Sequence, residues 1–246
     1  MNRWVTILRR GVPVYTEKPP ATSAAAALAV ARVAAETGVL CTTAFKKRYA
    51  AAYIRAREFI DATGGLMSIS VDYCSGHFTN ATAAESFLLD FAIHCIDLVG
   101  CLAGEAARVF AFTADDHAYA VSIEFAGGAV GSLNLNDGRS FQVPTEEVEI
   151  TLAGGNWMTV HNSSCWRIVT DGRPSEWREP PTFTSSGDSG LDTGHLAEIV
   201  DFLAAIAEAR STRSNIYESY KSMVLYEAIR ASAQTRQVVD VTYEAV

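Results

Sequence analysis

The order of helical and strand-like segments constrains the fold of this chain more than any other feature. An apolar run over 12–16, an alanine-rich stretch over 24–37 and a second apolar run over 39–44 predict strand, helix and strand. Thr22-Ser23 supplies the helix cap and Gly38 its stop. From residue 66 onward the sequence consists mainly of short segments in which apolar and polar residues alternate, separated by turn residues. We therefore expect a βαβ unit followed by a larger sheet domain.

The larger domain is expected to hold an open sheet. A long helix over 83–102 and two closing helices over 196–209 and 216–233 interrupt the strand-like segments. The polar stretch 172–190 is typical of a long surface loop. The fold class is therefore α/β (α+β), with a mixed or antiparallel sheet and helices on one face. Strands are predicted over 66–73, 108–113, 117–125, 129–135, 147–152, 157–160, 166–169 and 238–242.

Composition excludes several classes of partner. The net charge is -8 and no basic cluster stands out, which argues against nucleic acid. The longest apolar run, 24–35, is too short to cross a bilayer and contains Arg32, which argues against a membrane span. Five cysteines without a C-x-x-C pair predict neither a metal site nor a disulfide framework. We expect a cytoplasmic protein with reduced thiols.

Two short motifs bring together groups that can move a proton. Glu17-Lys18-Pro19-Pro20 ends the first strand, and Asp90, His94 and Asp97 recur at i, i+4 and i+7 in a helical pattern. An amine, an imidazole and carboxylates in one pocket can take a proton from a hydroxyl. The alternative remains open at this point: the histidine is a core residue and the two aspartates are its buried partners.

In order along the chain, these motifs resemble a known family. Glu17-Lys18-Pro19, the segment 45–49, the D-x-x-x-H-x-x-D pattern and the ending 228–239 are similar to the glucose–fructose oxidoreductase / inositol dehydrogenase / MocA family. The resemblance implies the last units of a Rossmann domain over 1–63 and a substrate-binding and oligomerisation domain over 64–246. It implies hydride transfer between NAD or NADP and a secondary alcohol of a sugar or polyol. It also implies a homo-oligomer formed through the sheet face.

The same resemblance implies roles for single residues. Lys18, Asp90 and His94 would be catalytic and would contact the substrate together with Tyr73. His94 would take the hydroxyl proton while Lys18 holds the reacting oxygen. The Lys18-Pro19 bond is a candidate cis peptide. Residues implied to border the cofactor are Glu17, Lys18, Pro19 and Lys46.

Other polar residues keep two interpretations. Lys46, Lys47 and Arg48 either touch cofactor or substrate, or form an exposed helix start. Two interpretations also remain for the loop that follows the strand over 66–73. Tyr73, His77 and Asn80 either line the sugar pocket or belong to a polar surface loop. Further alternatives are that Asp97 supports the site from outside, that Trp157 and Trp166 pack in the sheet rather than bind sugar, and that Asp192 and His195 cap a helix.

The family's phosphate-binding turn has no counterpart in the sequence. No G-x-G-x-x-G exists, and the glycines of 153–156 lie within a predicted hairpin rather than before a helix. Only 17 residues precede Lys18, so we expect an amino-terminally truncated member that does not bind the whole dinucleotide by itself. The alternative function is a non-catalytic sugar-binding or assembly subunit without a complete cofactor site.

Overall fold

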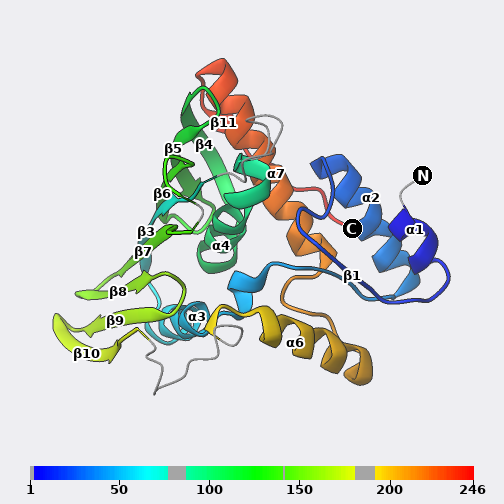
Figure 1. Cartoon of the computed structure of the whole chain (residues 1–246), viewed down its shortest axis with the longest axis horizontal. Coiled ribbons are helices and arrows are strands. Elements are labelled where there is room, and N and C mark those ends of the chain that lie inside the picture. The colour runs from blue at the N-terminus through cyan, green and yellow to red at the C-terminus, as the bar shows by residue number, and fades with distance from the viewer. Residues whose placement is uncertain (1–2, 77–86, 141, 181–191) are drawn as a thin grey trace.

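A computed structural model of the chain describes residues 3–76, 87–140, 142–180 and 192–246. A long sheet stands beside a small helical unit, with α6 below and α2 above the strand β1 (Figure 1). The elements are α1 (Arg3–Leu8), β1 (Val14–Thr16), α2 (Ala24–Thr37), β2 (Cys41–Thr43), η1 (Lys46–Tyr49), α3 (Ala51–Thr63), β3 (Leu66–Cys74), η2 (Phe87–Phe91), α4 (Ile93–Ala103), β4 (Ala106–Ala114), β5 (Ala118–Phe125), β6 (Val130–Asn136), β7 (Thr145–Leu152), β8 (Asn156–His161), β9 (Cys165–Thr170), β10 (Arg173–Arg178), α6 (His195–Glu208), α7 (Ile216–Thr235) and β11 (Val239–Asp240).

The small unit is the predicted strand–helix–strand arrangement. β1 and β2 are parallel, with Val14 opposite Cys41. The Ser23 hydroxyl accepts a hydrogen bond from the backbone N–H of Ala26 at 3.2 Å, and Gly38 ends α2 with a φ of 67°. Leu8 is fully buried between α1 and the strand layer. Both helix boundaries predicted from the sequence are therefore confirmed.

The large unit is a nine-stranded mixed sheet with strand order 10-9-8-7-3-6-5-4-11. β3 runs parallel to β6 and antiparallel to β7, and the remaining neighbours are antiparallel. Burial alternates along β3: Ile69 and Val71 are buried, whereas Ser70 and Asp72 are exposed. Only one face of the sheet is therefore covered. Helices α4 and α7 pack on that face (Figure 1). The predicted fold class is confirmed.

Two predicted segments differ from the structure. β10 occupies part of the predicted loop 172–190, because Glu176 accepts hydrogen bonds from Arg55 and from the Trp166 indole at 2.6 Å. An edge strand that is held by polar contacts has no alternating hydrophobic pattern, so the sequence did not predict it. The described part of the predicted helix 83–102 opens with the π-helical turn η2 before α4 begins. The domain boundary at 63/64 stays a prediction. None of the helices in the described ranges is long and apolar enough to cross a membrane.

Candidate active site

Lys18 and Asp90 meet at the carboxyl end of β1. The Lys18 ammonium donates a hydrogen bond to Oδ1 of Asp90 at 2.7 Å and another to the Asp90 carbonyl oxygen. It also lies 5.6 Å from the centre of the Phe91 ring. The Lys18-Pro19 peptide is cis, as predicted. Both side chains remain partly accessible, so the ion pair stands where a ligand can reach it.

His94 projects from the first turn of α4 with its Nδ1 atom buried. Its ring lies edge-on to that of Phe45, with centroids 6.1 Å apart. Nδ1 has no hydrogen-bond partner among the described residues. Burial lowers the pKa of His94 well below its usual value, and the charges of Lys47 and Lys18 lower it further. The imidazole is therefore neutral near pH 7 and can accept a proton.

Lys47, in the 3₁₀ turn η1, is the charged residue that lowers the pKa of this histidine most. Lys47 is only 7% exposed and pairs with Glu146 of β7. Glu146 also accepts hydrogen bonds from Tyr53 at 2.5 Å and from Ser163 at 2.7 Å. The buried charge is therefore fully compensated. The interpretation of Lys47 as part of an exposed helix start is wrong, because its partner comes from a distant strand.

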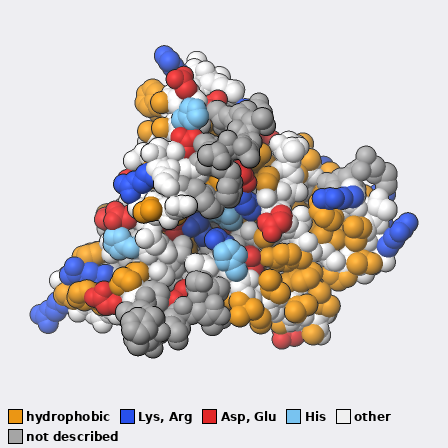
Figure 2. All heavy atoms as spheres, viewed as in Figure 1, with side chains coloured by type: hydrophobic (Ala, Val, Ile, Leu, Met, Phe, Trp, Pro, Cys, Tyr) orange, Lys and Arg blue, Asp and Glu red, His pale blue; other side chains and the backbone are white. Residues whose placement is uncertain are grey.

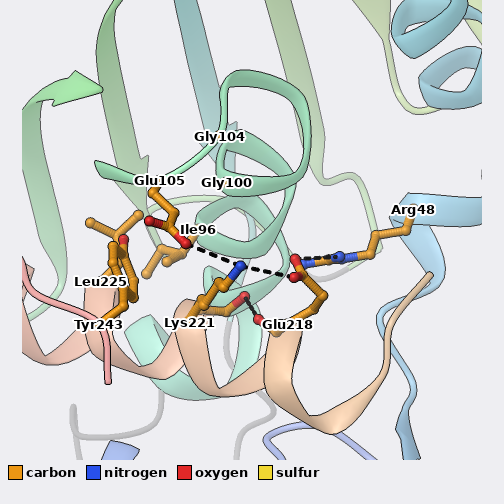
Figure 3. A pocket seen from close by; sticks show the side chains of 10 residues that line it. Arg48, Ile96, Gly100, Gly104, Glu105, Glu218, Lys221, Leu225 and Tyr243 are labelled. Atoms are coloured by element: carbon orange, nitrogen blue, oxygen red, sulfur yellow. Dashed lines mark hydrogen bonds and ion pairs between the residues drawn. The ribbon is translucent and has the colours of Figure 1, made fainter. Parts of the chain in front are cut away.

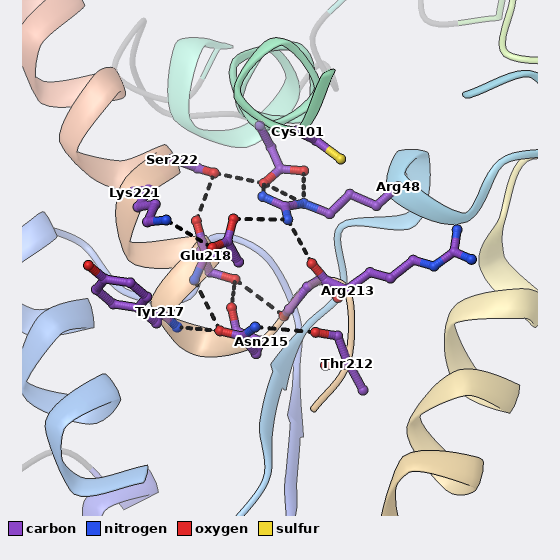
Figure 4. A network of polar contacts seen from close by, with 12 residues as sticks. Arg48, Cys101, Thr212, Arg213, Asn215, Tyr217, Glu218, Lys221 and Ser222 are labelled. Atoms are coloured by element: carbon purple, nitrogen blue, oxygen red, sulfur yellow. Dashed lines mark hydrogen bonds and ion pairs between the residues drawn. The ribbon is translucent and has the colours of Figure 1, made fainter. Parts of the chain in front are cut away.

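Arg48 is equally buried and is bound by Asp97. Its Nε lies 2.9 Å from Oδ2 and its Nη2 2.9 Å from Oδ1 of the fully buried Asp97 (Figure 4). Ser222 of α7 donates to the same carboxylate at 2.7 Å. The exposed-start interpretation is wrong for Arg48 too. Asp97 and Asp90 thus bind Arg48 and Lys18, so they are not buried partners of His94; Asp97 ties η1 to α4 and α7.

A small cavity of about 70 Å³ lies beside the Arg48 network (Figure 3). The ammonium of Lys221 points into it and binds Glu105 at 3.1 Å and Glu218 at 3.0 Å. The charges of Lys221, Glu105 and Glu218 are therefore paired with one another at this cavity.

The amino end of α6 packs against η1. Gly194 is the N-cap, with a φ of 88° and no side-chain cap, so the prediction that Asp192 and His195 cap the helix is wrong. Asp192 instead binds Arg178 at 2.7 Å. His195 Nδ1 lies 2.9 Å from the Thr193 hydroxyl. Basic and histidine side chains gather at the centre of this face (Figure 2).

Sequence reasoning missed a buried acid in α6. Glu198 is 3% exposed, and burial together with the charge of Glu198 raises the pKa of the neighbouring Tyr15. Burial raises the pKa of Glu198 to about 7, and its Oε2 atom has no partner among the described residues. The only signal in the sequence was a glutamate within a strongly apolar helix.

The other predicted site residues lie around the same region. Tyr73 is half-buried at the end of β3, and its ring centre is 5.9 Å from the Lys47 ammonium. Glu17 is exposed, and its charge raises the pKa of Glu198. Lys46 and Pro19 are half-buried. His77 and Asn80 lie outside the described residues.

The two tryptophans discussed above lie on β8 and β9. The Arg178 guanidinium lies 4.9 Å from the Trp166 ring centre, and that of Arg167 lies 5.4 Å from that of Trp157. Both rings therefore stack with cations of the same β-hairpins, which agrees with packing in the sheet. The described residues contain no group of three histidine, cysteine or acidic side chains that could hold a metal ion.

Comparison with known proteins adds independent findings. Levoglucosan dehydrogenase, solved with NADH and L-sorbose, superposes with a TM-score of 0.85 at 21% identity, covering 98% of this chain and 76% of that chain. An oxidoreductase from Agrobacterium radiobacter, solved with NAD+, L-tartaric acid and magnesium, gives 0.80 at 15% identity, covering 96% and 75%. GenD2 from gentamicin A biosynthesis, in complex with NAD, gives 0.77 at 21% identity, covering 97% and 74%. These likenesses establish the shared fold.

Sequence comparison identifies the family directly. No curated protein matches the chain. The family model for the carboxyl-terminal alpha/beta domain of the GFO/IDH/MocA oxidoreductases, however, matches residues 80–241, which include Asp90, His94 and Asp97. The matched segment is well over half of the chain and carries most of the nine-stranded sheet. The chain therefore belongs to the GFO/IDH/MocA oxidoreductase family.

Proposed function

We propose that this chain serves hydride transfer between NAD or NADP and a secondary alcohol of a sugar or cyclitol. The observation that carries the proposal is a neutral, half-buried imidazole, its Nδ1 atom buried without a partner among the described residues, near an accessible Lys18–Asp90 pair. Family membership supports the reaction class. Solved structures of the same fold that contain NADH together with L-sorbose or levoglucosan support the substrate class.

Each of the three residues has a chemical task in this proposal. The Lys18 ammonium donates a hydrogen bond to the reacting oxygen and stabilises its negative charge as the proton leaves. His94 accepts that proton, because its neutral ring is the form that acts as a base. Asp90 orients the ammonium. A bound nicotinamide would supply the hydride acceptor, so that the alcohol carbon becomes a carbonyl carbon.

The described residues are suited to contact the nicotinamide end of the dinucleotide better than its pyrophosphate. Glu17, Pro19 and Lys46 stand near the Lys18 site and are suited to border the reacting ring. A pyrophosphate needs free amide groups at the start of a helix. At α2 two of these amides are already bonded, because Glu227 accepts from the Ala24 N–H at 2.8 Å and Ser23 from that of Ala26. Among the described residues, those near Lys18 thus fit the nicotinamide end, whereas the start of α2 does not fit the pyrophosphate.

A His94→Asn variant tests the proposal. The wild-type chain, supplied with NAD or NADP and a panel of polyols, is expected to form reduced cofactor, measured by its absorbance. His94→Asn should lower that rate by roughly 10²–10⁴-fold, the usual contribution of a general base. The matched control is His161→Asn, since His161 is exposed on β8. Full activity in His94→Asn would overturn the proposal.

A second candidate is the sugar-binding or assembly subunit, favoured by the occupied amino end of α2 and by an apolar helix surface. Five large apolar residues of α6 are exposed, and an apolar patch covers the region of α6 in Figure 2. Such a surface is suited to covering by another polypeptide. Saturable polyol binding with no reduction of added NAD or NADP would favour this candidate. The exposed residues are Leu196, Ile199, Val200, Leu203 and Ile206.

A further inference from the structure

The buried carboxylate of Glu146, near the start of β7, receives hydrogen bonds from four other segments of the chain. The Lys47 ammonium of η1 binds its Oε2 atom, and the Tyr53 hydroxyl of α3 donates to Oε1 at 2.5 Å. The Ser163 hydroxyl, in the turn between β8 and β9, donates to Oε1 at 2.7 Å. The Cys95 thiol of α4 lies 3.8 Å from Oε2. This one side chain therefore holds η1, α3 and α4 to the large sheet.

The hairpin turn between β8 and β9 fixes the position of this carboxylate. Asn162 and Ser163 have φ angles of 48° and 60°, the left-handed conformation that a two-residue hairpin turn requires. The Asn162 N–H donates to the Glu146 carbonyl oxygen at 2.9 Å, and the Asn162 Oδ1 atom accepts from the Glu146 N–H at 3.0 Å. The same turn thus holds both the backbone and the side chain of Glu146. The carboxylate is therefore anchored in the sheet, and η1 packs onto it.

The Lys47 ammonium is enclosed by protein groups. It donates to Glu146 and, at 3.3 Å, to the Ser163 hydroxyl. Its Nζ atom also lies 5.9 Å from the ring centre of Tyr53 and 5.9 Å from that of Tyr73, the residue opposite Glu146 in the sheet. A buried ion pair of this kind gives little or no stability over apolar side chains of similar size. The presence of the charge therefore calls for an explanation other than stability.

Two contacts connect this ion pair to His94. Cys95, whose thiol shares the Oε2 atom of Glu146 with the Lys47 ammonium, directly follows His94 in α4. Phe45, two residues before Lys47, places its ring edge-on to the imidazole, with the ring centroids 6.1 Å apart. The segments that carry Lys47 and His94 are therefore held against each other on both sides of the ion pair.

The charges that act on His94 agree with this geometry. Burial lowers the pKa of His94, and among the charged groups Lys47 lowers it most. Lys18 at the end of β1, Lys46 in η1 and His195 at the start of α6 lower it less. Of these four groups Lys47 is the one with a buried side chain, so solvent and salt screen its charge least.

We propose that Lys47, fixed by Glu146, is a positioning residue whose enclosed charge keeps the imidazole of His94 in its proton-accepting form. This inference rests on the proposed function, in which His94 takes the proton of the substrate hydroxyl. Glu146 compensates the desolvation of the ammonium and holds it in place, so the charge persists without any contact to substrate. Hydride transfer then continues to lower pH than an ordinary imidazole would allow.

The double variant Lys47→Met/Glu146→Gln removes the ion pair without leaving a buried charge unpaired. Because the ammonium has the largest effect of any charge on His94, the ring should then take up a proton more easily. NMR of the imidazole resonances in the full chain, without cofactor or sugar, should place the His94 titration about one pH unit higher than in the wild type. Should this variant not fold, Lys47→Gln/Glu146→Gln, whose two amides can bond to each other, measures the same shift.

The pH dependence of turnover tests the catalytic consequence. With NAD or NADP and a polyol that is oxidised, the rate should fall on the acid side, because a protonated His94 no longer accepts a proton. In the double variant this fall should occur about one pH unit higher. Tyr53→Phe is the structural control, since it removes a hydrogen bond to Glu146 but no charge. It should lower the urea midpoint and leave the acid limb of the pH profile in place.

The two measurements separate this inference from the proposed function. An unchanged His94 titration or an unmoved acid limb in the folded double variant would overturn the inference and leave hydride transfer standing. An equal shift in Tyr53→Phe would overturn it too, because packing rather than charge would then control the ring. Full activity of His94→Asn alongside the expected shift of the titration would instead remove the proposed function alone.

Discussion

The ammonium of Lys18 and the carboxylate of Asp90, 72 residues apart in the chain, lie 2.7 Å from each other. Lys18 follows a parallel strand of the small unit, and Asp90 belongs to the π-helical turn before α4. Because both side chains are partly exposed, the pair contributes at most about 1 kcal/mol to stability. Its main consequence is electrostatic, since it fixes a cation close to His94.

Replacing Lys18 by methionine is expected to raise the pKa of His94. Burial is the largest cause of the lowered pKa, and Lys18 adds to it by repelling the protonated ring. Without that charge the imidazolium is less disfavoured, so the titration moves back toward the usual value. Histidine resonances followed by NMR over pH 3–8 measure the shift. Lys221→Met should leave the curve unchanged; an unaltered His94 titration in Lys18→Met would show that the two groups are not coupled.

Removing Asp97 is expected to destabilise the chain strongly. Asp97→Ala leaves the Arg48 guanidinium buried without its carboxylate, which typically costs about 3–5 kcal/mol of unfolding free energy. Urea denaturation measures this value. The control is Asp61→Ala, because the exposed i,i+4 pair of Asp61 with Arg57 should contribute about 0.5 kcal/mol or less. Similar losses in both variants would contradict the buried network of Figure 4.

The sequence predicted the elements whose signals are local. The limits of α2 followed from Ser23 and Gly38, and the hairpin at Gly127-Gly128 from its turn residues. The meeting of Lys18 with Asp90 followed from the order of motifs in the family, since nothing local in either segment indicates the other. Local signals thus gave the elements, and the resemblance placed the site.

Burial of Lys47 and Arg48 could not be predicted in the same way. Three consecutive basic residues are typical of a solvated surface. Their actual environment depends on Glu146, which is 99 residues from Lys47, and on Asp97 in α4. In α6 the sequence pattern fails in the opposite way. The apolar Leu203 is exposed, and the acidic Glu198 is buried. Both cases are set by tertiary contacts that a hydrophobic pattern does not encode.

Glu198 is expected to make stability fall as pH rises. Its pKa is raised from 4.5 to about 7 in the folded chain, so the folded state binds more protons than the unfolded state between those values. Stability therefore decreases as pH rises from about 4.5 to 7, with a penalty on the order of 3 kcal/mol present above that range. Glu198→Gln removes the titration and should be more stable than the wild type at pH 8 but not at pH 4.5.

Urea denaturation at the two pH values measures this difference. Glu179→Gln is the control, because Glu179 is exposed beyond β10 and should leave the pH dependence unaltered. If Glu198→Gln follows the wild-type pH dependence, the buried acid is ionised without penalty and the assignment fails.

Association through the open face of the sheet stays a prediction, and Phe112 tests it. Phe112 is 56% exposed on β4 and stacks edge-on with Phe110, their ring centroids 4.8 Å apart. Exposed aromatic side chains on a sheet face are suited to burial against a second subunit. We expect light scattering to give about twice the 26.5 kDa chain mass for the wild type and the single-chain mass for Phe112→Glu, because a buried unpaired carboxylate is costly. Val12→Glu, an equally exposed apolar position outside the sheet, should still associate. If Leu203→Glu dissociates the assembly and Phe112→Glu does not, the contact is made by α6 and the sheet face is free.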